Sequence, residues 1–126
     1  MTATVIGYTL AGLIAVAIVF IGARFLIAPK VAAAGYGVPA DPGEPSVAAY
    51  LRVKGVRDIA SGLFVVILMV AGTPHLLGWI ILAACIIPVA DAAIVAADGG
   101  PRSISLGVHG LTAVVMLVAS ALLLLA

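Results

Sequence analysis

Four ionisable residues lie inside stretches that are otherwise apolar: Arg57, Asp58, Asp91 and His109. An ionisable side chain within a bilayer costs at least about 2.5–3.5 kcal/mol on insertion scales, so it normally faces protein or water and finds a partner. Two carboxyl groups, one fixed cation and one imidazole can transfer protons and stabilise charge that develops during a reaction. We therefore take these four residues as candidate catalytic residues for acid/base chemistry.

A polar stripe accompanies two of these residues on the second apolar stretch. Its members follow the i, i+3, i+4, i+7 spacing of one helix face: Tyr50, Lys54, Arg57, Asp58 and Ser61. Arg52 and Lys54 are close enough to the end of the stretch to extend to the membrane surface, whereas Arg57 and Asp58 are too deep for this. Four residues are candidate ligand-binding residues: Arg24, Tyr50, Lys54 and Ser61.

The other apolar stretches place polar residues at a similar depth. The third aligns Ala84, Pro88 and Asp91, and Pro88 frees a backbone carbonyl near residue 84. The fourth aligns Ser105, His109, Thr112 and Met116 on one face. We expect Arg57, Asp58, Asp91 and His109 to line one buried polar region in the cytoplasmic half of the membrane.

A purely structural role for the charged cluster stays open. Arg57 paired with Asp91, and Asp58 capping a neighbouring helix or paired with Arg24, would fix the register of the helices. His109 could be a hydrogen-bonded core histidine. One deep histidine and two carboxylates show no metal-ligand spacing, so we expect no metal site.

Composition identifies the elements that must position these residues. Of the 126 residues, 65% are hydrophobic and 9% are charged, and the mean hydropathy is +1.38, more apolar surface than a soluble domain of this size can bury. Four apolar runs are long enough to cross a bilayer: residues 5–28, 46–71, 76–97 and 104–126. The first is too long for a signal peptide core, and no Lys or Arg precedes it. The sequence predicts an all-α fold with one domain over residues 1–126, a bundle of four transmembrane helices.

Basic residues indicate how the bundle crosses the membrane. All six flank or enter the first or third connection: Arg24, Lys30, Arg52, Lys54, Arg57 and Arg102. Because Lys and Arg collect on the cytoplasmic side, this predicts a multi-pass protein, of the bacterial inner membrane, with both termini extracytoplasmic. The chain has no basic tail, so we expect no nucleic-acid partner. The lipid bilayer is the expected partner, and a homo-oligomer is left open.

The first connection, "PKVAAAGYGVPADPGEP", is the only long one. Its Pro39, Pro42 and Pro45, together with three glycines, predict that it forms no regular helix. It is either a solvated connector or a cover over the cytoplasmic mouth of the bundle. Elsewhere, Cys85 has no partner cysteine and is expected to be a buried small residue, and His75 beside Trp79 is expected to be an interfacial anchor.

The segments "KGVRDIASG", "PVADAAIV" and "HG" resemble a family of small four-helix membrane proteins catalogued as a domain of unknown function, which looks related to DoxX-like membrane proteins. The most specific residues are Gly55, Arg57, Asp58 and Gly62, followed by Asp91 and His109. The resemblance implies the four-helix fold and the importance of these positions, but no substrate. DoxX-like proteins are linked with redox and quinone biology, and the absence of a cysteine pair argues against a dithiol role here.

Two functions of different classes follow. The first is an acid/base enzyme of the isomerase, cyclase or hydrolase type that acts on a lipophilic small molecule and needs no cofactor, since no cofactor fingerprint is present. The alternative is a non-enzymatic DoxX-like membrane subunit or a lipophile- or quinone-binding protein. A proton or ion path is a third reading, disfavoured because the outer half lacks ionisable residues.

Overall fold

The computed structural model describes residues 2–38, 41 and 43–126, and within these ranges the chain is helical with no strand. The elements are, in order, α1 (Ala3–Ile27), α2 (Pro29–Tyr36), α3 (Pro45–Ala71), α4 (Pro74–Ala84), α5 (Ile86–Ala97), α6 (Arg102–Ile104), the π-helical turn η1 (Ser105–Gly110) and α7 (Leu111–Leu124). The all-α prediction is confirmed. The chain is divided into more helices than the four that were expected.

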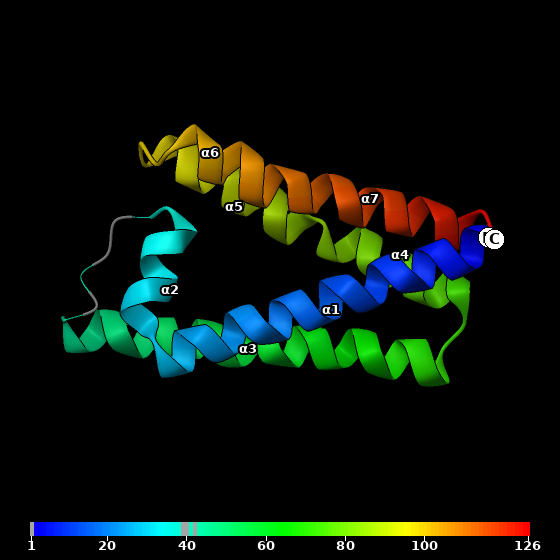
Figure 1. Cartoon of the computed structure of the whole chain (residues 1–126), viewed down its shortest axis with the longest axis horizontal. Coiled ribbons are helices and arrows are strands. Elements are labelled where there is room, and N and C mark those ends of the chain that lie inside the picture. Colours follow the sequence, from blue (N-terminus) through cyan, green and yellow to red (C-terminus); the bar gives the residue numbers. More distant parts are fainter. Residues whose placement is uncertain (1, 39–40, 42) are drawn as a thin grey trace.

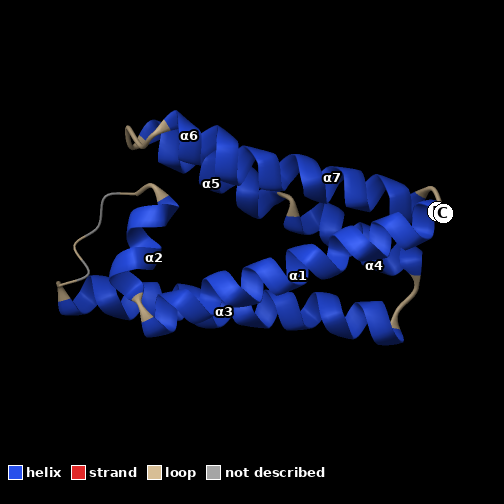
Figure 2. Ribbon diagram, in the orientation of Figure 1, coloured by secondary structure: helices blue, strands red, loops and turns tan. Residues whose placement is uncertain are grey.

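The long helices form two antiparallel pairs (Figure 1). One pair is α1 with α3, and the other is the α4–α5 rod with the rod made by α6, η1 and α7. The pairs meet at the end that carries both termini and the α3–α4 connection, where α1 also packs on α7. They diverge toward the opposite end, and α2 lies between them there (Figure 2).

Glycines bring α1 and α3 together. A Cβ added at Gly22 would stand 2.5 Å from the Gly55 carbonyl oxygen, and one added at Gly55 would stand 2.6 Å from the Gly22 carbonyl oxygen. Gly62, farther along α3, packs against Ala15 and Val19 of α1. Because these residues lack a side chain, the two backbones approach more closely than larger residues would allow.

The apolar core lies at the end where the pairs meet. Ala11 of α1, Leu77 and Ile81 of α4, and Leu123 of α7 are all fully buried in one cluster. Nearby, the Ser120 hydroxyl donates a hydrogen bond to the Gly78 carbonyl oxygen at 3.0 Å. The hydrophobic contacts that hold the two pairs together are therefore remote from α2.

Three of the described segments are long and apolar enough to cross a membrane: Ala3–Ile27, Pro74–Ala97 and Arg102–Leu124. Their outer faces expose large apolar side chains such as Val16, Ile86 and Leu106, as expected for surfaces that face lipid. α3 has 27 residues but carries four charges within its length, at Arg52, Lys54, Arg57 and Asp58.

The prediction that the first connection forms no regular helix is wrong for residues 29–36. Pro29 occupies the first turn of α2, where its missing N–H costs nothing, and the alanines that follow favour a helix. Gly37, with a φ of 93°, ends α2 in the left-handed conformation. Pro39 and Pro42 lie outside the described residues.

The third and fourth apolar runs are less regular than expected. The third is divided at Cys85, three residues before Pro88, which agrees with the predicted effect of this proline. The fourth begins with α6 and then widens into η1, a change that no pattern in the sequence predicts. As expected, Cys85 is buried.

Candidate functional site

Five titratable side chains surround the C-terminal end of α2. Tyr36 is the last residue of α2, Lys54 and Asp58 come from α3, Asp91 comes from α5, and His109 comes from η1. They therefore belong to both helix pairs and to the short helix between them. We call this set the polar cluster.

Lys54 and Asp58 form the side of the polar cluster that belongs to α3. The Lys54 Nζ lies 2.6 Å from the Asp58 Oδ2, and the exposed fractions of the two side chains are 27% and 14%. The same ammonium lies 4.7 Å from the ring centroid of Phe25 and 4.7 Å from that of Tyr36. The expectation that Lys54 extends to the membrane surface is therefore wrong, because a carboxylate and two aromatic rings hold its charge inside the protein.

His109 forms the opposite side, with a partner at each ring nitrogen. Its Nε2 lies 3.0 Å from the Tyr36 carbonyl oxygen, which can only accept, so Nε2 carries the hydrogen. Its Nδ1 lies 3.9 Å from the Asp91 Oδ2. The imidazole also meets the Tyr36 ring edge-on, with 4.8 Å between the centroids. His109 is thus buried and oriented by a backbone carbonyl, with a carboxylate at its second nitrogen.

The π-helical turn η1 sets the position of His109. Its wider turn is anchored to α5, because the buried Ser105 hydroxyl donates to the Ala92 carbonyl oxygen at 2.8 Å. Thr112, which was expected to share a face with Ser105 and His109, is exposed and donates to the Val108 carbonyl oxygen. The extra residue of a π turn changes the helical register, and such turns are frequent at functional sites.

Tyr36 is the member of the polar cluster that sequence reasoning missed. Burial, followed by hydrogen bonding with Asp91 and the charges of Asp91 and Asp58, raises the pKa of its phenol well above the ordinary value. The phenol stays protonated and can donate a hydrogen bond. Helical spacing did not identify Tyr36 as a site residue, because Tyr36 lies in a connection. The one sequence feature that distinguishes it is that it is an aromatic residue between two glycines, Gly35 and Gly37.

The other candidate residues lie apart from the polar cluster. Arg57 is exposed, and in the described part of the chain it forms no ion pair with Asp91. Successive residues of a helix point about 100° apart, so Arg57 and Asp58 do not share a direction. Tyr50 is 76% exposed, and the Ser61 hydroxyl donates back to the Arg57 carbonyl oxygen.

Arg24 does not pair with Asp58, which is bonded to Lys54 instead. Its guanidinium lies over the Phe20 ring, 5.9 Å from the centroid. Within the described ranges, no three His, Cys, Asp or Glu side chains are grouped as a metal site requires.

We expect the Tyr36→Phe variant to lose less stability than wild type between pH 9 and pH 12. Because folding raises the pKa of Tyr36, the unfolded chain loses this proton first as the pH rises, so wild-type stability falls above about pH 10. Phenylalanine has no proton to lose and keeps the ring. Thermal unfolding in detergent at several pH values measures the difference, with the exposed Tyr50→Phe as the control. Parallel wild-type and Tyr36→Phe curves would contradict the burial of this phenol.

The fold and the polar cluster define an all-helical protein that has, in the described residues, three helical segments long and apolar enough to span a membrane, and a cluster of five titratable side chains around the end of α2. The chain belongs to the family described as domain of unknown function DUF4267, whose family model matches residues 15–123. All members of the polar cluster fall within the matched region. No curated protein and no solved structure matches the chain. The expected membership of a family of unknown function is confirmed, whereas a relationship to DoxX-like proteins rests on the sequence resemblance alone.

Proposed function

We propose that this protein is a membrane enzyme that performs acid/base chemistry on a lipophilic small molecule at the polar cluster. The observation that carries the proposal is the convergence of five titratable side chains from four separate segments on one place, around Tyr36. The reaction class is isomerisation, cyclisation or hydration, which need proton transfer and charge stabilisation without a cofactor.

Stability alone does not account for the polar cluster. Buried charged pairs contribute little to folding, and apolar side chains of similar size often serve as well or better. The helix pairs are already held by glycine contacts between α1 and α3 and by the apolar core near the termini. A grouping of ionisable side chains that the fold does not need is typical of a functional site.

The geometry suggests a role for each member. His109 exchanges a proton with the substrate through Nδ1, because Nε2 is held by the Tyr36 carbonyl oxygen, and the Asp91 carboxylate 3.9 Å from Nδ1 stabilises the imidazolium. The protonated phenol of Tyr36 and the ammonium of Lys54 stabilise negative charge on the substrate, while Asp58 holds Lys54 in place. Arg57 is left out of this set because its side chain is exposed.

The proposal includes four membrane spans, with α3 as the fourth. α3 runs beside α1 for most of its length, and Lys54, which is paired with Asp58, faces the rings of Phe25 and Tyr36 rather than lipid. All six basic residues of the chain lie in the last turn of α1, in α2, in the first half of α3 or in α6, and these segments border the end that contains α2. By the positive-inside rule that half is cytoplasmic, in a bacterial inner membrane, with both termini outside.

One observation favours a second function, a non-enzymatic DoxX-like subunit or lipophile- or quinone-binding protein. Lys54 and Asp58 already satisfy each other, and every buried side-chain nitrogen and oxygen atom in the described residues has a hydrogen-bond partner. A polar cluster of this kind could hold α2 in place without any reaction.

The test is to express the wild type, His109→Gln and Asp91→Asn in a bacterial host grown in ordinary water, to incubate the isolated membranes with a lipid extract in deuterium oxide, and to compare the lipids by mass spectrometry. An acid/base enzyme is expected to produce a lipophilic compound that carries solvent deuterium or one added water. We expect each substitution to lower the initial rate at which this compound forms by about 10²–10⁴-fold, the usual contribution of general acid/base catalysis.

The control is Thr112→Val, since Thr112 is exposed near His109 but outside the polar cluster. Equal product in all variants would refute the proposed chemistry. A wild type that forms no new compound but carries a lipophile through purification would support the binding protein instead.

A further inference from the structure

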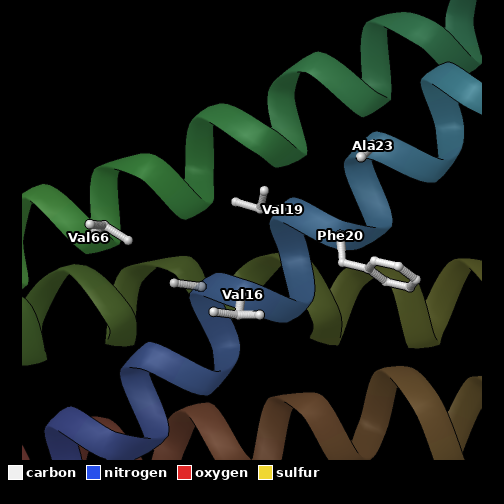
Figure 3. A pocket seen from close by; sticks show the side chains of 6 residues that line it. Val16, Val19, Phe20, Ala23 and Val66 are labelled. Carbon is white, nitrogen blue, oxygen red and sulfur yellow. The ribbon is translucent and has the colours of Figure 1, made fainter.

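An apolar groove runs along the outer face of α1 (Figure 3). Its lining consists only of apolar side chains, five from α1 and one from α3: Ala15, Val16, Val19, Phe20, Ala23 and Val66. The cavity volume is about 370 Å³. The groove shares no residue with the polar cluster, so its occupant is a question separate from the proposed reaction.

Arg24 stands at one end of this groove. It follows Phe20 by one helical turn, and its guanidinium lies 5.9 Å from the centroid of the Phe20 ring that lines the groove. Its side chain is half-buried, and no carboxylate in the described part of the chain lies within 4.0 Å of it. A half-buried guanidinium without an acidic partner leaves its charge to be matched by something outside the protein.

We infer that the groove and Arg24 form a binding site for an anionic phospholipid of the surrounding bilayer. The acyl chain lies along α1 from Ala15 to Ala23, a distance of about 12 Å at the rise of an α-helix, and the phosphate contacts Arg24. A guanidinium suits this ligand because its planar donors bind phosphate oxygens in pairs. Stacking on Phe20 limits the orientations of the guanidinium, which lowers the entropy lost on binding.

The position of Arg24 and the groove in the membrane is consistent with a phospholipid ligand. Arg24 lies in the last turn of α1, at the same end of the molecule as α2 and the other basic residues, where anionic headgroups of the cytoplasmic leaflet would lie in the proposed orientation. The groove extends from there toward the middle of α1, as an acyl chain extends from its headgroup. One lipid can therefore satisfy both parts of the site.

Native mass spectrometry of the detergent-solubilised protein tests this inference. The wild type is incubated with equal amounts of phosphatidylglycerol and phosphatidylcholine, and retention of each lipid is measured. We expect the wild type to prefer phosphatidylglycerol and Arg24→Gln to reduce that preference about tenfold, the effect of losing one charge-assisted contact. Ala23→Leu, which fills part of the groove, is expected to lower retention of both lipids.

Arg57→Gln is the matched control, because it removes an exposed guanidinium from the same end of the molecule without touching the groove. Its preference should equal that of the wild type. The inference fails if Arg24→Gln keeps the wild-type preference, if Arg57→Gln reduces it equally, or if Ala23→Leu binds both lipids as the wild type does. Thermal unfolding of each variant confirms that it is folded.

Discussion

Replacing His109 by leucine and Asp91 by valine together is expected to give a folded protein that has lost its function. The single change His109→Leu leaves the Asp91 carboxylate without its imidazole partner and the Tyr36 carbonyl without a donor. We expect this variant to lose about 1–3 kcal/mol, less than for a fully buried pair because the Asp91 side chain is 22% exposed. Adding Asp91→Val removes this charge but also the carboxylate that hydrogen-bonds with the Tyr36 phenol, so stability should return in part toward that of the wild type while function stays lost.

Thermal unfolding in detergent and the deuterium incorporation described above measure the two properties in the same preparations. The matched control is the double variant Thr112→Val with Arg57→Leu, which removes two polar groups at exposed positions near the same end. Wild-type function in the stable His109→Leu, Asp91→Val protein would show that the polar cluster is structural. Loss of function with recovered stability would support a chemical role.

The second large effect is expected at the contact between α1 and α3. In Gly22→Ala the new methyl group would stand 2.5 Å from the Gly55 carbonyl oxygen and 2.9 Å from the Asp58 Cβ, so the helices must separate. Such overpacking usually costs about 1–3 kcal/mol, which exceeds the gain of about 1 kcal/mol from the higher helix propensity of alanine. We expect a lower unfolding temperature in detergent.

Gly12→Ala on the same helix is the control for Gly22→Ala. There the new methyl would meet only the flexible end of Met69, at 3.4 Å, so its stability should equal or slightly exceed that of the wild type. Equal unfolding temperatures for the two variants would show that the close approach of the α1 and α3 backbones does not exclude a larger residue at position 22. Because the Gly22 contact also includes Asp58, Gly22→Ala should disturb the Lys54–Asp58 pair as well.

The long helices could be predicted from the sequence because hydrophobicity and length determine them. The apolar runs 5–28, 46–71, 76–97 and 104–126 correspond to the long helical segments within a few residues. α2 was missed since the rule that proline and glycine break helices was applied to the whole connection. Proline is compatible with the first turn of a helix, where Pro29 lies, and glycine is compatible with the position just after the last turn, where Gly37 lies.

The candidate site could be predicted only in part. Depth and helical spacing brought together Asp58, Asp91 and His109, which the structure places on different sides of Tyr36. Spacing alone could not separate Arg57 from Asp58, because the choice depends on how α3 rotates against α1. That rotation is set by the glycine contacts between the two helices, and no local pattern reports it.

The position of α2 between the diverging helix pairs determines which contacts resist a movement of one pair relative to the other. The two helix pairs are joined at the end that carries the termini, and α2 separates them at the opposite end. α2 follows α1 directly in the chain. It contacts the second helix pair through the His109 hydrogen bond and through the packing of Gly37 against Val95 and Ile104. A force that opens or closes the two helix pairs is therefore concentrated on a few contacts, and the hydrogen bond from His109 to the Tyr36 carbonyl oxygen is one of them.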